Sequence, residues 1–172
     1  MADLGSDAQP PAWLVAAQSV AQRTDNTVIS RGVAVGSSEI GLDVAPAVDG
    51  WLSDCCRTFV VGGGPEEHCL VGEVERIQSA LIDHVRPGMP ASEPFPFGAS
   101  LVADAGPKVL DLLDNIGRTI GRELATEGCI DASNDTPMWG AWTIEPHVGT
   151  QARGVKVDDM LRLPRHGSAV VL

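Results

Sequence analysis

Residues 41–61, GLDVAPAVDGWLSDCCRTFVV, read as two β-strands joined by a tight turn. Apolar residues alternate with others along the first strand, and Asp49-Gly50 is a strong signal for a hairpin turn. Asp43 and Asp54 lie on facing strands of this hairpin. Because an antiparallel pair brings opposite side chains to about 5 Å, the two carboxylates are close enough to share one ion.

Two later segments belong with this hairpin. They are residues 142–146, WTIEP, and residues 154–160, GVKVDDM. With the ten residues that separate Asp43 from Asp54, they form three blocks in a fixed order. The set resembles the M24 metallopeptidases, which include methionine aminopeptidase, aminopeptidase P and prolidase and share the pita-bread fold with creatinase. The resemblance covers residues 40–172 and is weakest between 90 and 135.

This resemblance implies an α+β fold with a curved antiparallel sheet and helices on its outer face. The chain has little sequence before the hairpin, so we expect the first half of the fold to be reduced. We expect residues 1–11 to form a flexible tail and residues 12–172 to form a single domain. A shortened half would expose apolar sheet surface, which predicts a homodimer.

The resemblance also implies a set of metal ligands. Family metallopeptidases bind two divalent ions through two Asp, one His and two Glu, and the ions activate a bridging water. Asp43 and Asp54 match the two Asp positions, and Glu145 matches the first Glu. Asp158 matches the second Glu with a side chain that is one methylene shorter. If the site still functions, the expected metals are Mn, Co, Zn or Fe.

The histidines of the family pattern are missing. No histidine occurs between His84 and His147, where the family places its ligand and a second catalytic histidine. The segment 117–121, GRTIG, is the nearest match to the ligand motif and puts Arg118 at the ligand position. A guanidinium has no lone pair to donate to a metal. Two orientations of Arg118 stay open, one toward the site and one toward solvent on a helix face.

Without a metal, the four acids cannot all stay charged at close range, so some would hold protons and act as general acids and bases. Creatinase is a family precedent for small-molecule chemistry without a metal. His147 follows Glu145-Pro146 and either points into the pocket as a replacement base or faces solvent. On this interpretation Asp54, Glu145, His147 and Arg118 are the catalytic candidates, and no cofactor is expected.

Composition excludes several other classes. The formal net charge of −11 and the scattered basic residues argue against nucleic-acid binding. The sequence has no apolar run long enough for a membrane span and no signal-like segment, so we expect a cytoplasmic protein. The four cysteines fit neither a zinc site nor a disulfide framework. The expected partner is a small-molecule or peptide-like substrate.

The hydrophobic patterns predict further elements along the chain. Residues 65–85 repeat apolar side chains at helical spacing, and residues 107–127 do so as well. Residues 90–98 contain three prolines and two phenylalanines, which predicts an irregular loop. A short helix is expected at 12–22, and strands are expected at 27–35, 141–148, 155–163 and 169–172.

Three functional hypotheses follow. The first is an enzyme repurposed for acid-base chemistry on a small amide- or amino-acid-like molecule, without the complete dinuclear metal site. The second is a metal-dependent X-Pro aminopeptidase or prolidase-type hydrolase. The third is a non-catalytic binding module that keeps the fold of a peptidase.

Overall fold

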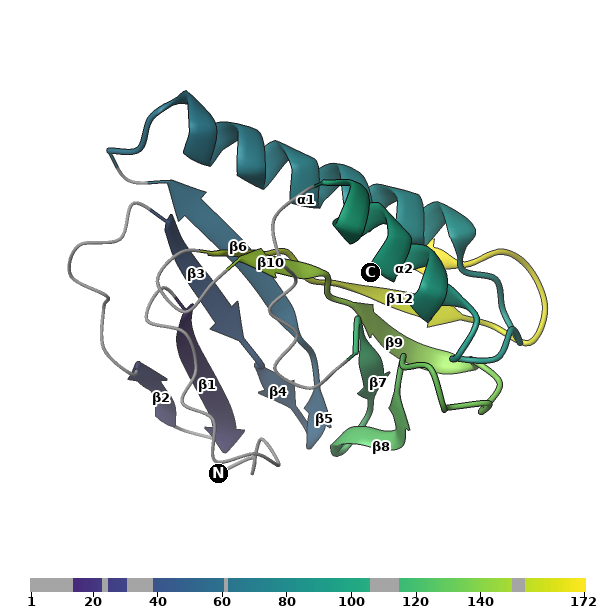
Figure 1. Cartoon of the computed structure of the whole chain (residues 1–172). Helices are drawn as coiled ribbons and strands as arrows, with labels where there is room; N and C mark the ends of the chain where they lie inside the picture. The colour runs from purple at the N-terminus through teal and green to yellow at the C-terminus, as the bar shows by residue number, and fades with distance from the viewer. Residues whose placement is uncertain (1–13, 23–24, 31–38, 61, 106–114, 150–153) are drawn as a thin grey trace.

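A computed structural model describes residues 14–22, 25–30, 39–60, 62–105, 115–149 and 154–172 (Figure 1). The first sheet has the strand order β2-β1-β3-β6. In it, β1 is parallel to β3 and the other neighbours are antiparallel. Its strands are β1 (Leu14–Gln22), β2 (Asp25–Ser30), β3 (Glu39–Val44) and β6 (Cys55–Val60).

The second sheet has the order β13-β12-β9-β7-β8 and is antiparallel throughout. Its strands are β7 (Arg118–Ile120), β8 (Leu124–Cys129), β9 (Gly140–Ile144), β12 (Asp159–Leu163) and β13 (Val170–Val171). Two small pairs complete the strands, β4 (Ala47–Val48) with β5 (Trp51–Leu52), and β10 (His147–Gly149) with β11 (Gly154–Lys156).

The expected hairpin is confirmed. β3 and β6 pair antiparallel, and β4 and β5 form the tip between them. Asp49 and Gly50 both have positive φ, 51° and 79°, as a tight two-residue turn of this kind requires. The turn therefore fixes the register that places Asp43 opposite Cys56, with Asp54 one residue before β6.

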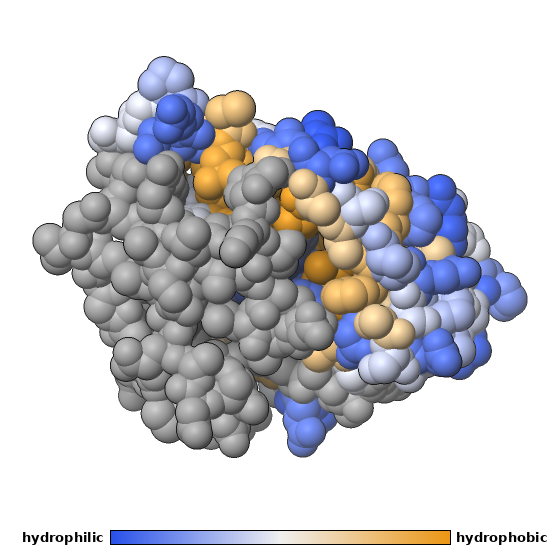
Figure 2. All heavy atoms as spheres, in the orientation of Figure 1, coloured by the Kyte–Doolittle hydropathy of each residue, from blue (hydrophilic) through white to orange (hydrophobic). Residues whose placement is uncertain are grey.

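Helix α1 (Pro65–His84) is also confirmed. Proline suits its first position, and Glu67 accepts a hydrogen bond from the Gly64 amide at 2.7 Å, which caps the helix. Its inner face buries Val74, Ile77 and Leu81 completely. Figure 2 shows hydrophilic atoms interspersed with hydrophobic ones along the upper edge of the molecule, where α1 lies.

The core fills the space between α1 and the second sheet. Trp142 and Ile144 of β9 and Leu161 and Leu163 of β12 are buried against the helix residues. Helix α2 (Pro94–Asp104) lies beside α1 and adds Val102 to this cluster (Figure 1). Burial of this apolar surface is the main stabilising term available to the fold.

Two predicted elements are wrong: the helix expected at 12–22, over its described residues, and the loop expected at 90–98, from residue 94 onward. Residues 14–22 form β1 rather than a helix, because the chain pairs with β3 on one side and β2 on the other. Residues 94–98 begin α2 rather than a loop, with Pro94 in the first turn. The first-turn amides have no acceptor within a helix, so proline is tolerated there.

The helix predicted at 107–127 is wrong where the structure describes it. Residues 118–120 are β7 and residues 124–129 are β8, while 106–114 lie outside the described residues. β7 pairs with β8 and β9, and this pairing overrides the helical spacing of the apolar residues. The C-terminal strands are confirmed, although 141–148 and 155–163 are interrupted at Glu145-Pro146 and at Val157-Asp158. The predicted strand at 27–35 is described only as far as Ser30.

Candidate functional site

Four acidic side chains converge where the two sheets meet, and we call them the acid cluster. Asp43 lies on β3 and Asp54 just before β6. Glu145 follows β9, and Asp158 lies between β11 and β12. Asp54, Glu145 and Asp158 are 4%, 3% and 0% exposed. The sequence analysis named all four. Glu145 lies at the interruption of the predicted strand 141–148, and Asp158 lies at the interruption of the predicted strand 155–163.

Hydrogen bonds between the sheets hold the cluster together. The Asp158 amide donates to the Cys56 carbonyl at 3.1 Å. The Thr58 hydroxyl donates to the Lys156 carbonyl at 2.9 Å and accepts from the Lys156 amide at 3.0 Å. The Glu145 amide donates to the Ile116 carbonyl at 2.9 Å. The backbone at Asp158 and at Glu145 is therefore fixed from a second segment.

Arg57 adds a contact from the outer side of the first sheet. Its guanidinium donates to the Asp158 carbonyl at 2.5 Å and to the Cys56 carbonyl at 2.8 Å. It also forms an ion pair with Asp159. Arg57 thus fixes the backbone around Asp158 without contacting the Asp158 carboxylate.

Lys156 enters the cluster, and the sequence interpretation missed it. Its Nζ lies 2.8 Å from Asp43 Oδ2 and 2.9 Å from Glu145 Oε2, and the side chain is 5% exposed. The available signal was its position between Val155 and Val157, both buried. A lysine flanked by apolar residues in a buried strand needs an internal partner, because an unpaired buried charge is costly.

Arg118 also faces the cluster. Of the two orientations that the sequence left open, toward the site or toward solvent, the structure has the first. Its Nη2 donates to Glu145 Oε2 at 2.9 Å, and its Nε lies 3.4 Å from Asp54 Oδ2. The residue is 8% exposed, because β7 is an inner strand of the second sheet rather than a surface helix. Lys156 and Arg118 therefore both bind the same oxygen of Glu145.

The environment pushes the pKa values of two of the acids in opposite directions. Burial, assisted by Glu145 and Asp43, raises the pKa of Asp54 to about 7, although Lys156 and Arg118 oppose the rise. Burial also acts to raise the pKa of Glu145, but Lys156 and Arg118 outweigh it and bring that pKa to about 2. Glu145 is therefore ionised at neutral pH while Asp54 is close to half protonated.

Asp158 has the most secluded carboxyl group. Burial, and then the charge of Glu145, raise its pKa well above its ordinary value. Neither of its side-chain oxygens has a hydrogen-bond partner among the described residues. Oxygens of Asp43, Asp54 and Asp158 lie within 4.8 Å of one another, so this trio offers oxygen ligands for one cation.

His147 lies next to the acid cluster. It begins β10 and pairs with Lys156 of β11, and the residue is half-buried. Its charge contributes to the lowered pKa of Glu145. Whether His147 points into a pocket as a replacement base stays a prediction.

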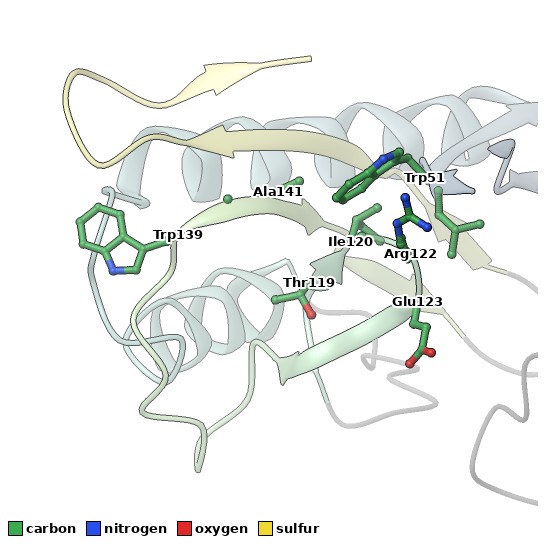
Figure 3. A pocket seen from close by; sticks show the side chains of 10 residues that line it. Trp51, Thr119, Ile120, Arg122, Glu123, Trp139 and Ala141 are labelled. Carbon is green, nitrogen blue, oxygen red and sulfur yellow. The ribbon is translucent and has the colours of Figure 1, made fainter. Parts of the chain in front are cut away.

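A pocket of about 620 Å³ lies near the residues that follow Arg118. It is lined by Thr119 and Ile120 of β7, by the β7–β8 turn, by the end of the β4–β5 hairpin and by the start of β9. Figure 3 shows Trp51 and Trp139 at opposite ends of this pocket. The guanidinium of Arg122 stacks over the Trp51 ring at 5.3 Å.

Comparison with known proteins identifies the family and the fold. Residues 17–163 match the sequence profile of metallopeptidase family M24. The chain belongs to this family. A curated M24-like relative, the Xaa-Pro dipeptidase of Lactobacillus delbrueckii subsp. lactis, is 30% identical over 129 residues, which cover 73% of this chain and 35% of that protein.

Solved structures confirm the pita-bread fold of this M24 protein. The prolidase from Pyrococcus furiosus has a TM-score of 0.72 at 19% identity, covering 94% of this chain and 49% of that one. Methionine aminopeptidase from Thermotoga maritima has a TM-score of 0.68 at 17% identity, covering 94% and 77%. The chain thus spans about a third to a half of the dipeptidase and the prolidase.

In its described part, neither helix is long and apolar enough to cross a lipid bilayer.

Proposed function

We propose that this M24 protein acts on a small amide- or amino-acid-like molecule by acid-base chemistry, without the complete dinuclear metal centre of its family. The observation that carries the proposal is the pair of cations inside the acid cluster. Arg118 and Lys156 both lie 2.9 Å from Glu145 Oε2, and Lys156 also holds Asp43.

The residues present do not fit two divalent ions. The position that matches the nitrogen ligand carries Arg118, which stays protonated and offers no lone pair. At about 5 Å and an effective dielectric constant of 20, each pair of unit charges interacts by roughly 3 kcal/mol. Arg118 and Lys156 together would therefore strongly repel a pair of divalent ions placed among these acids.

The same cations prepare the carboxyl groups for proton transfer. Arg118 lies between Asp54 and Glu145, and these two acids have separated pKa values of about 7 and about 2. Groups separated in this way suit the roles of proton donor and proton acceptor. Asp54 would exchange the proton, while Arg118 and Lys156 keep Glu145 ionised and fixed.

The test is turnover of a panel of X-Pro dipeptides and other N-acyl amino acids, with and without EDTA. We expect turnover that EDTA leaves unchanged and that Asp54→Asn and Glu145→Gln abolish. Glu75→Gln on the exposed face of α1 is the matched control and should keep full turnover. Full turnover in both cluster variants would refute the proposal.

Burial favours a second candidate, a non-catalytic binding module. Asp158 is 0% exposed and Asp54 is 4% exposed, so the cluster has the character of a closed internal charge network. If the protein is a binding module, it turns over none of the X-Pro dipeptides or other N-acyl amino acids, with or without added metal. Asp54→Asn and Glu145→Gln would then change the free energy of unfolding alone.

A metal-dependent X-Pro hydrolase is the third candidate. It is favoured by the Xaa-Pro dipeptidase relative and by the three aspartate carboxylates within 4.8 Å of one another. Such an enzyme would use Mn, Co, Zn or Fe to activate water and would lose turnover in EDTA. Elemental analysis of the purified protein, together with the dipeptide assay, separates it from the first proposal.

A further inference from the structure

The guanidinium of Arg118 occupies a position that joins three separate segments of the chain. It reaches from β7 to Glu145 at the end of β9, at 2.9 Å, and to Asp54 before β6, at 3.4 Å. All three residues are less than a tenth exposed. This is the contact pattern of a structural cation, which holds two carboxylates that would otherwise repel each other.

We propose that Arg118 is a built-in cation that takes the place of a divalent ion between Asp54 and Glu145. The inference rests on the proposed function in one respect, namely that the dinuclear centre is incomplete. It goes further by giving Arg118 a structural role, which is to hold Asp54 and Glu145 together as an ion would, and by naming these two carboxylates as the ligands that an ion would regain.

The carboxylate oxygens support this assignment. Asp54 Oδ2 and Glu145 Oε1 accept no hydrogen bond within the described part of the chain, although both are buried. Arg118 Nε lacks a well-aligned acceptor as well, so the guanidinium neutralises Asp54 by proximity rather than by a directed hydrogen bond. Removal of the guanidinium would leave two buried carboxylates with oxygens free to bind a hard cation such as Mn²⁺.

The experiment compares the wild-type chain with Arg118→Ala. Isothermal titration with Mn²⁺ after removal of bound metal gives the number of ions per chain, and thermal unfolding is followed with EDTA or with saturating Mn²⁺. We expect Arg118→Ala to bind one ion more than the wild type. We also expect its melting temperature to be lowered in EDTA and to rise by about 5 °C more than that of the wild type when Mn²⁺ is added.

Arg122→Ala is the matched control, because Arg122 is an exposed arginine four residues along the chain, beyond β7. It should bind the same number of ions as the wild type. If Arg118→Ala does not fold in EDTA, the variant is refolded with and without Mn²⁺. The proposal then requires that Mn²⁺ restores folding. Arg118→His provides a second variant that adds a nitrogen ligand and should bind Mn²⁺ more tightly than Arg118→Ala.

Equal ion numbers in the wild type and both Arg118 variants, with no extra thermal gain from Mn²⁺, would overturn the inference. This failure differs from failure of the proposed function. A wild-type chain that already binds two ions contradicts the absence of a dinuclear centre, whereas equal numbers below two contradict only the role of Arg118. Neither measurement depends on turnover.

Discussion

Lys156 carries a charge that the fold cannot solvate. Its ammonium group lies between Asp43 and Glu145, which come from different sheets, and the side chain is 5% exposed. Burial alone would lower the pKa of Lys156, but Glu145 and Asp43 raise it well above its ordinary value. The lysine is therefore protonated at neutral pH, and its charge offsets part of the negative charge of the acid cluster.

Replacement of Lys156 by methionine should destabilise the protein strongly. The change keeps the apolar stem but leaves Asp43 and Glu145 without their shared cation, and breaking a buried ion pair in this way typically costs about 3–5 kcal/mol. Urea unfolding at neutral pH measures the loss. Arg162→Met on the exposed face of β12 is the control and should change the free energy of unfolding little. A Lys156→Met loss no larger than that of the control would contradict the buried-pair assignment.

Asp54 should make stability depend on pH. Its pKa rises from 3.8 in its ordinary state to about 7 in the fold. Between these values the native state binds more protons than the unfolded state, so the free energy of unfolding falls as pH increases. Glu145 has the opposite sign, because its pKa falls from 4.5 to about 2, and its contribution grows as pH rises through that lower window.

We therefore expect stability in EDTA to be greatest near pH 4 and to fall by up to about 4 kcal/mol toward pH 7 through Asp54, at 1.4 kcal/mol per pKa unit. Urea unfolding across this range measures the fall. Asp54→Asn should reduce the fall, since the amide does not titrate, and Asp158, whose pKa is also raised, accounts for the part that remains. An unchanged slope in Asp54→Asn would show that other groups produce the pH dependence.

At the scale of elements, the segment that leads into β7 approaches β9 very closely. A Cβ atom added at Gly117 would lie 2.2 Å from the Thr143 carbonyl oxygen and 2.8 Å from the Ile130 side chain. The hydrogen bond from the Ile130 amide to the Gly117 carbonyl, at 2.7 Å, fixes the same segment. Only glycine allows this approach, which in turn places the side chain of Arg118 in the cluster.

Gly117→Ala should therefore destabilise the fold by about 2 kcal/mol or more, because backbone cannot move aside as a flexible side chain can. Gly72→Ala is the matched control. Nothing lies within 4 Å of a Cβ at Gly72 on α1, and alanine in an exposed helix position should add about 0.5–1 kcal/mol of stability. Thermal unfolding of the two variants should give shifts of opposite sign, and equal shifts would refute the close approach.

At the scale of the whole molecule, the β3–β6 pair of the first sheet has one face toward the acid cluster and one toward solvent. Asp43 and Cys56 are opposite each other on the inner face. The neighbouring positions carry Leu42 and Phe59, which are 40% and 52% exposed. Exposed apolar residues on a sheet face are typical of an interaction surface.

The homodimer stays a prediction, and this face gives it a test. Phe59→Ser should shift a dimer toward monomer in sedimentation velocity, because it removes an aromatic contact from the centre of the expected interface. Val171→Ser is the control, since Val171 has the same exposed fraction of 52% but lies on β13 in the other sheet. A monomeric wild type, or equal effects of the two variants, would contradict a dimer through this face.

The sequence was sufficient to place the hairpin and the acid cluster. Asp49-Gly50 sets the turn and hence the register of β3 with β6. The resemblance to the M24 family, carried by the spacing of Asp43 and Asp54 and by the motifs around Glu145 and Asp158, identified all four acids. These features depend on local turn chemistry and on motifs that are contiguous in the chain, and such information is present in the residues themselves.

The tertiary structure alone decided which cations reach those acids. Arg118 lies in a segment with helical spacing, yet strand pairing with β8 and β9 turns that segment into β7 and directs the guanidinium inward. Lys156 meets Asp43, 113 residues away, only because β11 packs against the first sheet. The physical reason is that burial of a charge depends on partners from distant segments, and sequence spacing carries no information about them.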